Sequence, residues 1–322
     1  MEKLTRRGFV KASAAAGIAL AAGIAPGADA VKPTMKKAWI VGKIDEAELT
    51  KLKNAGFDGV ETQAIVSPDE AAKGRAIAEK VGMKIHSVLR GWMNFNSKDP
   101  AAVKSSIEAT AAALRAAQGY GADAILLVPC RIGSKDMAMP EAWEFQIEFD
   151  EKTGHISKVA AGDNEKYKAY IEAHNWAVDS STKAVKELIP VAQETKVVIA
   201  LENVWNNLWV QPAIFKQFVA SFNDPWVKAY FDIGNHVKYA PPQDFINSLG
   251  KLIAKIHIKD FKLNPNGHGG TFVHPRDGSV NWPIVHKALV DAGYEGGWLT
   301  VEDGGLPLEE FNRRLDLIIA GK

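Results

Sequence analysis

The sequence predicts an α/β fold, a (β/α)8 barrel with an insertion after its fourth strand. Short apolar runs rich in β-branched and aromatic residues alternate with helix-like stretches, and eight such runs can be counted. The last four recur at intervals of roughly thirty residues, the repeat of one strand and one helix in a barrel. Each ends on a residue that can bind a metal: Glu202, Asp232, His257 and Glu302. Because parallel barrel strands end on one face, we expect these four side chains to meet there.

Run lengths and helix-end residues predict the first half of the barrel. Strands are expected at 37–43, 59–61, 83–89 and 124–128. Gly56 stops the first helix, Pro68 suits the first turn of the second, and Asp99 and Pro100 open the third. The three helices are expected at 46–55, 68–81 and 100 to about 120.

The second half repeats the pattern. A helix over 183–194 leads to the fifth strand, which ends at Glu202, and the closing helix is expected at 308–320. The segment 131–170 is too long for a simple loop, and βα loops gather on the catalytic face of a barrel. We interpret it as a lid or a partner-contact insertion. The alternative is a surface hairpin, because 144–159 alternates in hydrophobicity around Thr153 and Gly154.

Composition limits the class of protein. The 322 residues carry 39 basic and 38 acidic side chains, a net charge of +1, and no basic block after the first dozen residues, which argues against a nucleic-acid partner. The single cysteine, Cys130, excludes an internal disulfide and a cysteine-based zinc site. We expect a globular protein that binds a small molecule.

The first thirty residues have the parts of a signal peptide. Arg6 and Arg7 precede an Ala-rich, uncharged stretch over 12–26 and an Ala-Asp-Ala end at 28–30. Paired arginines indicate the twin-arginine route, so we expect a periplasmic protein with a catalytic domain over 31–322. The apolar stretch is shorter than the roughly 20 residues that a membrane span needs, so no stable span is expected after cleavage. The alternative is a frayed or membrane-anchoring N-terminal helix.

Three carboxylates and one imidazole at one barrel mouth predict a site for one divalent cation that prefers oxygen ligands. The motifs around them carry a family resemblance from about Val41 to the C-terminus. These motifs are Leu-Glu-Asn-Val-Trp-Asn (201–206), Tyr-Phe-Asp-Ile-Gly-Asn (230–235), Ile-His-Ile-Lys-Asp (256–260), Gly-Ser-Val-Asn-Trp-Pro (278–283) and Gly-Tyr-Glu-Gly-Gly-Trp-Leu-Thr-Val-Glu (293–302).

Together, in this order, the motifs resemble the sugar phosphate isomerase/epimerase family, built on the xylose isomerase-like TIM barrel. That family includes xylulose-phosphate 3-epimerases and tagatose/psicose 3-epimerases. The resemblance implies that Glu202, Asp232, His257 and Glu302 bind a metal, with Mn²⁺ favoured and Mg²⁺, Co²⁺ or Zn²⁺ as alternatives. It also implies that Glu202 and Glu302 are the catalytic acid/base pair.

The implied reaction moves a proton beside a carbonyl group through an enediolate, whose charge a cation stabilises. Two carboxylates on opposite faces of the sugar permit epimerisation, whereas transfer on one face gives isomerisation. Asn235 stands where free-ketohexose epimerases place a second histidine, and resembles the phosphate-sugar branch. An exported protein nevertheless meets unphosphorylated sugars, so we expect an unphosphorylated sugar or keto-sugar. Alternatives are a lyase or hydratase acting on a 3-keto-glycoside, and a non-catalytic sugar-binding barrel.

Further polar and aromatic residues at or near strand ends are candidates for substrate binding. Glu61 could instead bond neighbouring backbone, and His86, inside a strand, could be a core histidine. Two tryptophans could stack on a sugar or pack a lid. The candidates are Glu61, His86, Trp92, Trp205, Asn206, Asn235, Lys259, His268 and His274. A homo-oligomer is left open.

Overall fold

The computed structural model describes residues 34–322. Within this range, parallel strands close into a barrel in the order β1-β12-β9-β8-β7-β4-β3-β2. The strands are β1 (Lys36–Val41), β2 (Gly59–Thr62), β3 (Lys84–Trp92), β4 (Ala124–Val128), β7 (Val198–Glu202), β8 (Val227–Asp232), β9 (Ile253–Ile258) and β12 (Trp298–Val301). The predicted (β/α)8 barrel is confirmed.

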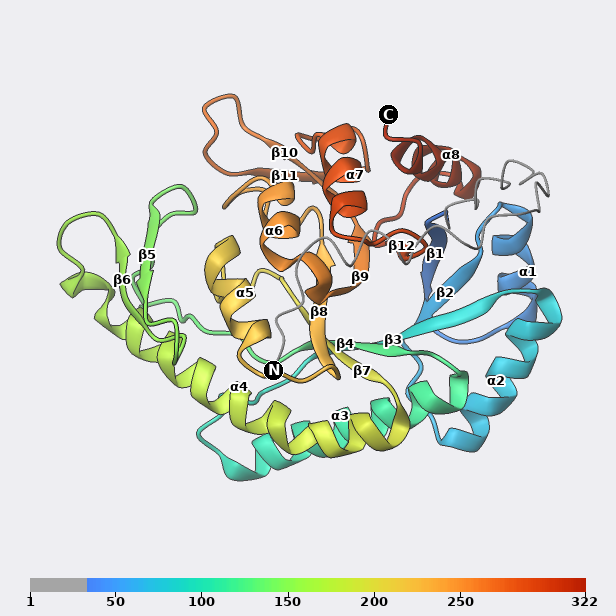
Figure 1. Ribbon diagram of the computed structural model, residues 1–322, viewed down its shortest axis with the longest axis horizontal. Coiled ribbons are helices and arrows are strands. Elements are labelled where there is room, and N and C mark those ends of the chain that lie inside the picture. Colours follow the sequence, from blue (N-terminus) through green and yellow to red (C-terminus); the bar gives the residue numbers. More distant parts are fainter. Residues whose placement is uncertain (1–33) are drawn as a thin grey trace, which may run out of the picture. The chain divides into compact units, whose positions relative to one another are not determined.

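Helices surround the strands (Figure 1). They are α1 (Glu46–Asn54), α2 (Pro68–Val81), α3 (Pro100–Tyr120), α4 (Lys168–Thr195), α5 (Pro212–Ala220), α6 (Pro242–Leu249), α7 (Trp282–Asp291) and α8 (Leu308–Ile319), with short 3-10 turns η1 (Glu165–Tyr167) and η2 (Gly250–Leu252). Local signals set their ends. Helix α2, for example, starts with a capping box between Ser67 and Glu70 and stops at Gly82, which has a φ of 73°. No helix in the described part of the chain is long and apolar enough to cross a membrane.

Two element boundaries differ from the sequence prediction by about three residues or more, and the others by no more than two. Strand β3 continues to Trp92 rather than stopping at Leu89. Helix α4 begins at Lys168 rather than at residue 183, because Tyr170, His174 and Ala177 carry its buried face toward the barrel at helical spacing.

The insertion after the fourth strand is present and contains an antiparallel hairpin, β5 (Phe145–Phe149) and β6 (Ile156–Ala160). The hairpin lies beside α4 (Figure 1) and is attached to the βα loops, since Gln211 Nε2 donates to the Phe145 carbonyl at 2.8 Å. Just before it, the Trp143 ring stacks on His268 with 4.1 Å between centroids. The insertion therefore reaches a second hairpin that the sequence did not predict, β10 (Asp260–Leu263) and β11 (Gly270–Val273).

The predicted signal peptide, residues 1–30, lies outside the described residues, and its cleavage and export route stay predictions.

Candidate metal centre

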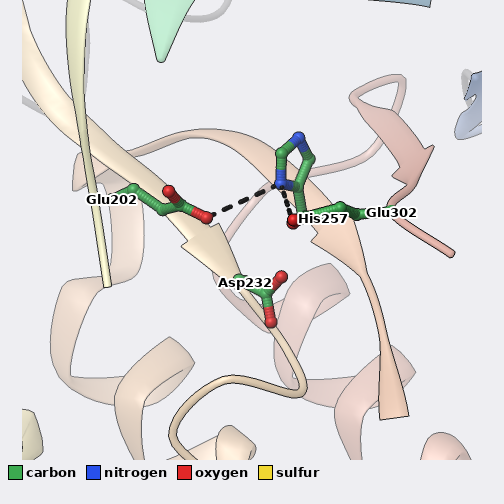
Figure 2. Close-up of side chains that lie close together, drawn as sticks. All are labelled: Glu202, Asp232, His257 and Glu302. Atoms are coloured by element: carbon green, nitrogen blue, oxygen red, sulfur yellow. Dashed lines mark ion pairs between the residues drawn. The ribbon is translucent and has the colours of Figure 1, made fainter. Parts of the chain in front are cut away.

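The four strand-end ligands predicted from the sequence converge. Glu202 ends β7, Asp232 ends β8, His257 lies in β9 and Glu302 follows β12, and each offers an atom within 4.8 Å of the others. Figure 2 shows the four side chains close together, with the Glu202 and Glu302 carboxylates both paired with the same nitrogen of the His257 imidazole. The parallel register of β8 and β9 places Asp232 directly opposite His257.

Local backbone contacts aim Asp232 into the centre. Its Oδ1 accepts hydrogen bonds from the Gly234 and Asn235 amides at 2.8 and 2.6 Å, which leaves Oδ2 facing the other ligands. Asn203 holds the backbone of Asp232 from the next strand, since its side chain both donates to the Asp232 carbonyl and accepts from its amide. Gly234 is required here because a Cβ would come within 2.8 Å of the Lys259 backbone.

His257 is oriented from behind by Glu61. Its Nε2 lies 2.6 Å from Glu61 Oε2, and both side chains are fully buried. Ser87 donates to the other carboxylate oxygen at 2.7 Å, so Glu61 is fixed as well. The sequence suggested that Glu61 either lines the pocket or bonds neighbouring backbone. Its carboxylate does neither, because it contacts the Ser87 and His257 side chains. It holds the imidazole so that Nδ1 faces the ligand cluster, a common arrangement around metal-binding histidines.

The donor set fits a cation. Among the described residues, His257 Nδ1, Asp232 Oδ2 and Glu302 Oε2 are buried without a hydrogen-bond partner. His257 Nδ1 and Glu302 Oε2 are only 2.9 Å apart, so two acceptors face each other unless a proton or a metal ion balances them. Three oxygen ligands and one nitrogen suit a divalent ion such as Mn²⁺ or Mg²⁺.

Electrostatics in the metal-free protein agree with this fit. Burial raises the pKa of Glu202 to about 7, opposed by His257 and reinforced by the neighbouring carboxylates. Burial likewise raises the pKa of Asp232 to about 6, against the attraction of Lys259. Burial would lower the pKa of His257, but the surrounding carboxylates raise it well above its usual value. The buried carboxylates thus favour a proton or another positive charge at this centre.

Lys259 and Asn235, two residues predicted to bind substrate, lie beside the four-residue cluster. The Lys259 ammonium lies 3.1 Å from Glu302 Oε1 and 3.6 Å from Asp232 Oδ2. Asn235 accepts from Lys259 at 3.3 Å and donates to the Asn203 carbonyl at 3.1 Å. The ammonium can therefore face a bound molecule while it stays paired with Glu302.

A cavity of about 440 Å³ opens beside this cluster. Lys259 and Glu302 line this cavity together with Phe272 of β11 and His274, which follows β11. A cavity of this size lies within the range of small-molecule sites, roughly 300–1,000 Å³. The structure thus brings the predicted residue His274 into the same cavity as the candidate metal ligand Glu302.

Two other residues predicted to bind substrate, His86 and Asn206, are buried and contact other parts of the protein. His86 is fully buried near the amino-terminal end of β3, where its ring stacks on Trp298 and its Nε2 lies 3.0 Å from Thr300 Oγ1. It is the core histidine that the sequence left as the alternative. Asn206 is also buried, and it donates to the Cys130 carbonyl and accepts from the Leu208 amide, so it shapes the loop after β7.

The remaining residues predicted to bind substrate lie at or beyond strand ends. Trp205 donates to the Asn235 carbonyl and packs against Phe272 with 4.8 Å between ring centroids. Trp92 is 43% exposed with the Arg131 guanidinium 4.2 Å above its ring. His268 is exposed and stacks on Trp143 of the insertion. Whether these rings contact a sugar remains a prediction.

Sequence reasoning missed Asn203, Ser87 and Asp303. Asn203 and Asp303 each follow a metal ligand directly in the chain, so their position next to Glu202 and Glu302 was the available signal. Ser87 has no such signal, because its partner Glu61 comes from a different strand.

Comparison with known proteins agrees with this description. Residues 49–315 match the family described as "Xylose isomerase-like TIM barrel". No curated protein sequence matches the chain significantly.

Several solved structures share the fold at low identity. A 3-keto-D-glucoside 4-epimerase from E. coli is 13% identical, with a TM-score of 0.62 over 89% of this chain and 99% of that one. A D-allulose 3-epimerase from Methylomonas sp. is 16% identical, with a TM-score of 0.63 over 90% and 99%. A xylose isomerase domain protein from Planctomyces limnophilus is 17% identical, with a TM-score of 0.60 over 90% and 97%. The closed barrel and the match over most of the sequence lead to one conclusion: the chain belongs to the xylose isomerase-like TIM barrel family.

Proposed function

We propose that this protein is a divalent-metal-dependent isomerase or epimerase of a sugar or keto-sugar, acting by proton transfer through an enediolate. The observation that carries the proposal is the pair of glutamates that approach the same nitrogen of His257 from two different strands. Its Nδ1 lies 3.7 Å from Glu202 Oε1 and 2.9 Å from Glu302 Oε2 (Figure 2). A metal held by these residues and Asp232 would supply Lewis-acid stabilisation of negative charge on the substrate oxygens.

The two glutamates differ in their tendency to hold a proton. Burial raises the pKa of Glu202 to about 7 in the metal-free protein, which favours a group that can carry a proton near neutrality. Burial would also raise the pKa of Glu302, but hydrogen bonding to His257 and the nearby Lys259 ammonium lower it, which favours a carboxylate that can accept one. Carboxyl groups whose pKa values are pushed apart are suited to separate acid and base roles.

Lys259 adds a fixed positive charge to this chemistry. Its ammonium lines the cavity and lies 3.1 Å from Glu302, so it can donate to a substrate oxygen that becomes negative in the enediolate. Its pairing with Glu302 also keeps that carboxylate ionised. Asn235 accepts from the same ammonium and limits where it can point.

We further propose that the substrate carries no phosphate and that the protein acts in the periplasm. Arg6 and Arg7 in the N-terminal segment support export, and phosphorylated sugars are cytoplasmic metabolites. The sugars named for two proteins of the same fold, a 3-keto-D-glucoside and D-allulose, are not phosphate esters either.

Single glutamine variants of the two glutamates test the proton-transfer roles. Metal-loaded mature protein would be incubated with a panel of free sugars and 3-keto-glycosides in deuterated water, with deuterium beside the carbonyl read by NMR or mass spectrometry. Glu202→Gln or Glu302→Gln should slow exchange by about 10²- to 10⁴-fold, the usual loss when an acid/base group is removed. Glu79→Gln, on an exposed helix surface, is the matched control and should exchange like the wild type.

Two outcomes would count against the proposal. Wild-type exchange in either active-site variant would remove that glutamate from the mechanism. Binding of a sugar without exchange on any member of the panel would favour a non-catalytic sugar-binding barrel.

A further inference from the structure

His274 and Asp303 form a second acid/base pair in the cavity beside the metal ligands. His274 Nδ1 lies 2.8 Å from Asp303 Oδ2, and the two side chains are 34% and 20% exposed. Both line the cavity of about 440 Å³ that Glu302 and Lys259 also line. Neither residue belongs to the four-ligand cluster, so the proposed proton transfer does not use them.

Each member of the His274–Asp303 pair has a further contact that fixes its position. Asp303 Oδ1 accepts from the Gly304 amide at 2.7 Å, which leaves Oδ2 for the imidazole. The His274 ring meets Phe311 of α8 edge to face, with 6.0 Å between ring centroids. Because the carboxylate accepts the Nδ1 proton, Nε2 is the ring nitrogen left to exchange a proton with a molecule in the cavity.

The loop that carries His274 is built around the buried carboxylate of Asp260. That carboxylate accepts from the Phe261, Arg276, Gly278 and Val280 amides and from Trp282 Nε1. A Cβ at Gly278 would overlap Asp260 Oδ1, so only glycine allows this approach. Arg314 of α8 ties the loop from outside by donating to the Pro275 carbonyl at 2.6 Å.

One residue of this loop shows that its shape is imposed. Arg276 has a φ of 79°, a left-handed conformation that is strained for a non-glycine residue. A strained backbone held by many hydrogen bonds keeps a side chain at a set position, which is what a preorganised catalytic group requires. The Gly-Ser-Val-Asn-Trp-Pro motif, 278–283, thus supports the placement of His274.

We propose that His274, positioned by Asp303, is a general acid that protonates the leaving oxygen of a substituent on the substrate, so that the site eliminates an alcohol from a 3-keto-glycoside. The inference rests on the proposed function, because the same enediolate must form first. The proposal requires a substrate that carries an oxygen substituent on the carbon adjacent to the one that loses its proton.

The elimination balances without any added reactant. A glutamate takes the proton from the carbon next to the ketone, and the electron pair of that C–H bond forms the new C=C bond. The C–O bond to the substituent breaks, and the departing oxygen takes a proton from His274 Nε2 to leave as an alcohol. The products are an unsaturated keto-sugar and the alcohol, and His274 regains its proton from solvent.

The dependence on the leaving group tests this role. Methyl and 4-nitrophenyl 3-keto-glucosides would be given to the metal-loaded wild type, His274→Gln and Asp303→Asn, with alcohol release and deuterium exchange measured together. Methanol is a poor leaving group and needs an acid, whereas 4-nitrophenolate leaves unprotonated. His274→Gln should slow methanol release about 10²- to 10⁴-fold more than it slows 4-nitrophenolate release or proton exchange. Asp303→Asn should show the same selectivity with a smaller loss, because it disturbs only the imidazole orientation.

The outcomes separate this inference from the proposed function. Equal losses for both leaving groups, or unchanged methanol release in His274→Gln, would overturn the acid role. Wild-type proton exchange without release of either alcohol would also overturn it and leave the proposed isomerase or epimerase intact. Absence of both exchange and release in the wild type would refute the proposed function, and the elimination with it.

Discussion

The Glu61→Gln substitution tests whether the buried carboxylate behind His257 supports metal binding. The change keeps the shape of the side chain and removes its charge. In the structure, Glu61 Oε2 lies 2.6 Å from His257 Nε2, and neither residue is exposed to solvent. A hydrogen bond to a charged group contributes about 1.5–3 kcal/mol, and each 1.4 kcal/mol is roughly tenfold in an equilibrium constant. We therefore expect Mn²⁺ affinity to fall by about 10- to 100-fold, the usual range for such outer partners.

The assay is competition for Mn²⁺ between metal-depleted protein and a chelating dye. Ser87→Ala is the matched control, because it removes a hydrogen bond from Glu61 Oε1 and leaves the carboxylate charged. A neutral hydrogen bond contributes about 1 kcal/mol, so the control should lose less than about tenfold in affinity. Thermal unfolding in the presence of EDTA would show that both variants fold. A folded Glu61→Gln protein with wild-type Mn²⁺ affinity would refute the reasoning.

The remaining predictions concern pH and export. Because burial raises the pKa of Glu202 to about 7 and that of Asp232 to about 6, metal affinity should fall as pH drops through this range, and binding should release protons that calorimetry in two buffers can count. Burial lowers the pKa of His174 to about 3 in the folded protein, whereas its value in the unfolded chain is about 6.5. The unfolded chain therefore takes up a proton at a higher pH than the folded protein does, and stability should be lost as pH falls below about 6.5. At pH 4.5 the loss from this residue is about 2–3 kcal/mol, and His174→Leu should flatten the pH dependence of chemical denaturation. Replacing Arg6 and Arg7 with lysine should leave uncleaved protein in the cytoplasm, as read by fractionation and immunoblotting.

Each of these has a result that would contradict it. Metal affinity that does not change between about pH 5 and 8 would mean that the ligand carboxylates are not protonated in the metal-free centre. An unchanged pH slope for His174→Leu would mean that the histidine is not held neutral in the folded protein. Normal periplasmic appearance of the double lysine variant would exclude the twin-arginine route.

The barrel and the candidate metal ligands could be predicted because their signals are local and repeated. A strand can be recognised by its apolar run, and Glu202, Asp232 and His257 each lie at or next to the end of such a run. Parallel strands in a closed barrel share one direction, so residues at their ends must meet without any further knowledge of packing. The ends of α2 depend equally on local signals, because Ser67, Glu70 and Gly82 cap their own helix.

The roles of the remaining site residues depended on contacts between distant parts of the chain. Glu61 and His86 are both polar residues in early strands, yet Glu61 supports His257 from β9 and His86 stacks on Trp298 from β12. Which neighbour each one meets is decided by strand order and barrel closure.

The sequence by itself determined the fold class, the four converging ligands and the existence of an insertion. Only the tertiary structure decided that Glu61 orients a ligand, that Asp260 shapes the loop carrying His274, and that His274 meets Asp303 in the cavity. The physical reason is distance along the chain. Hydrophobic periodicity acts over a few residues, whereas a hydrogen bond between side chains far apart in sequence exists only after the barrel has closed and brought them within about 3 Å.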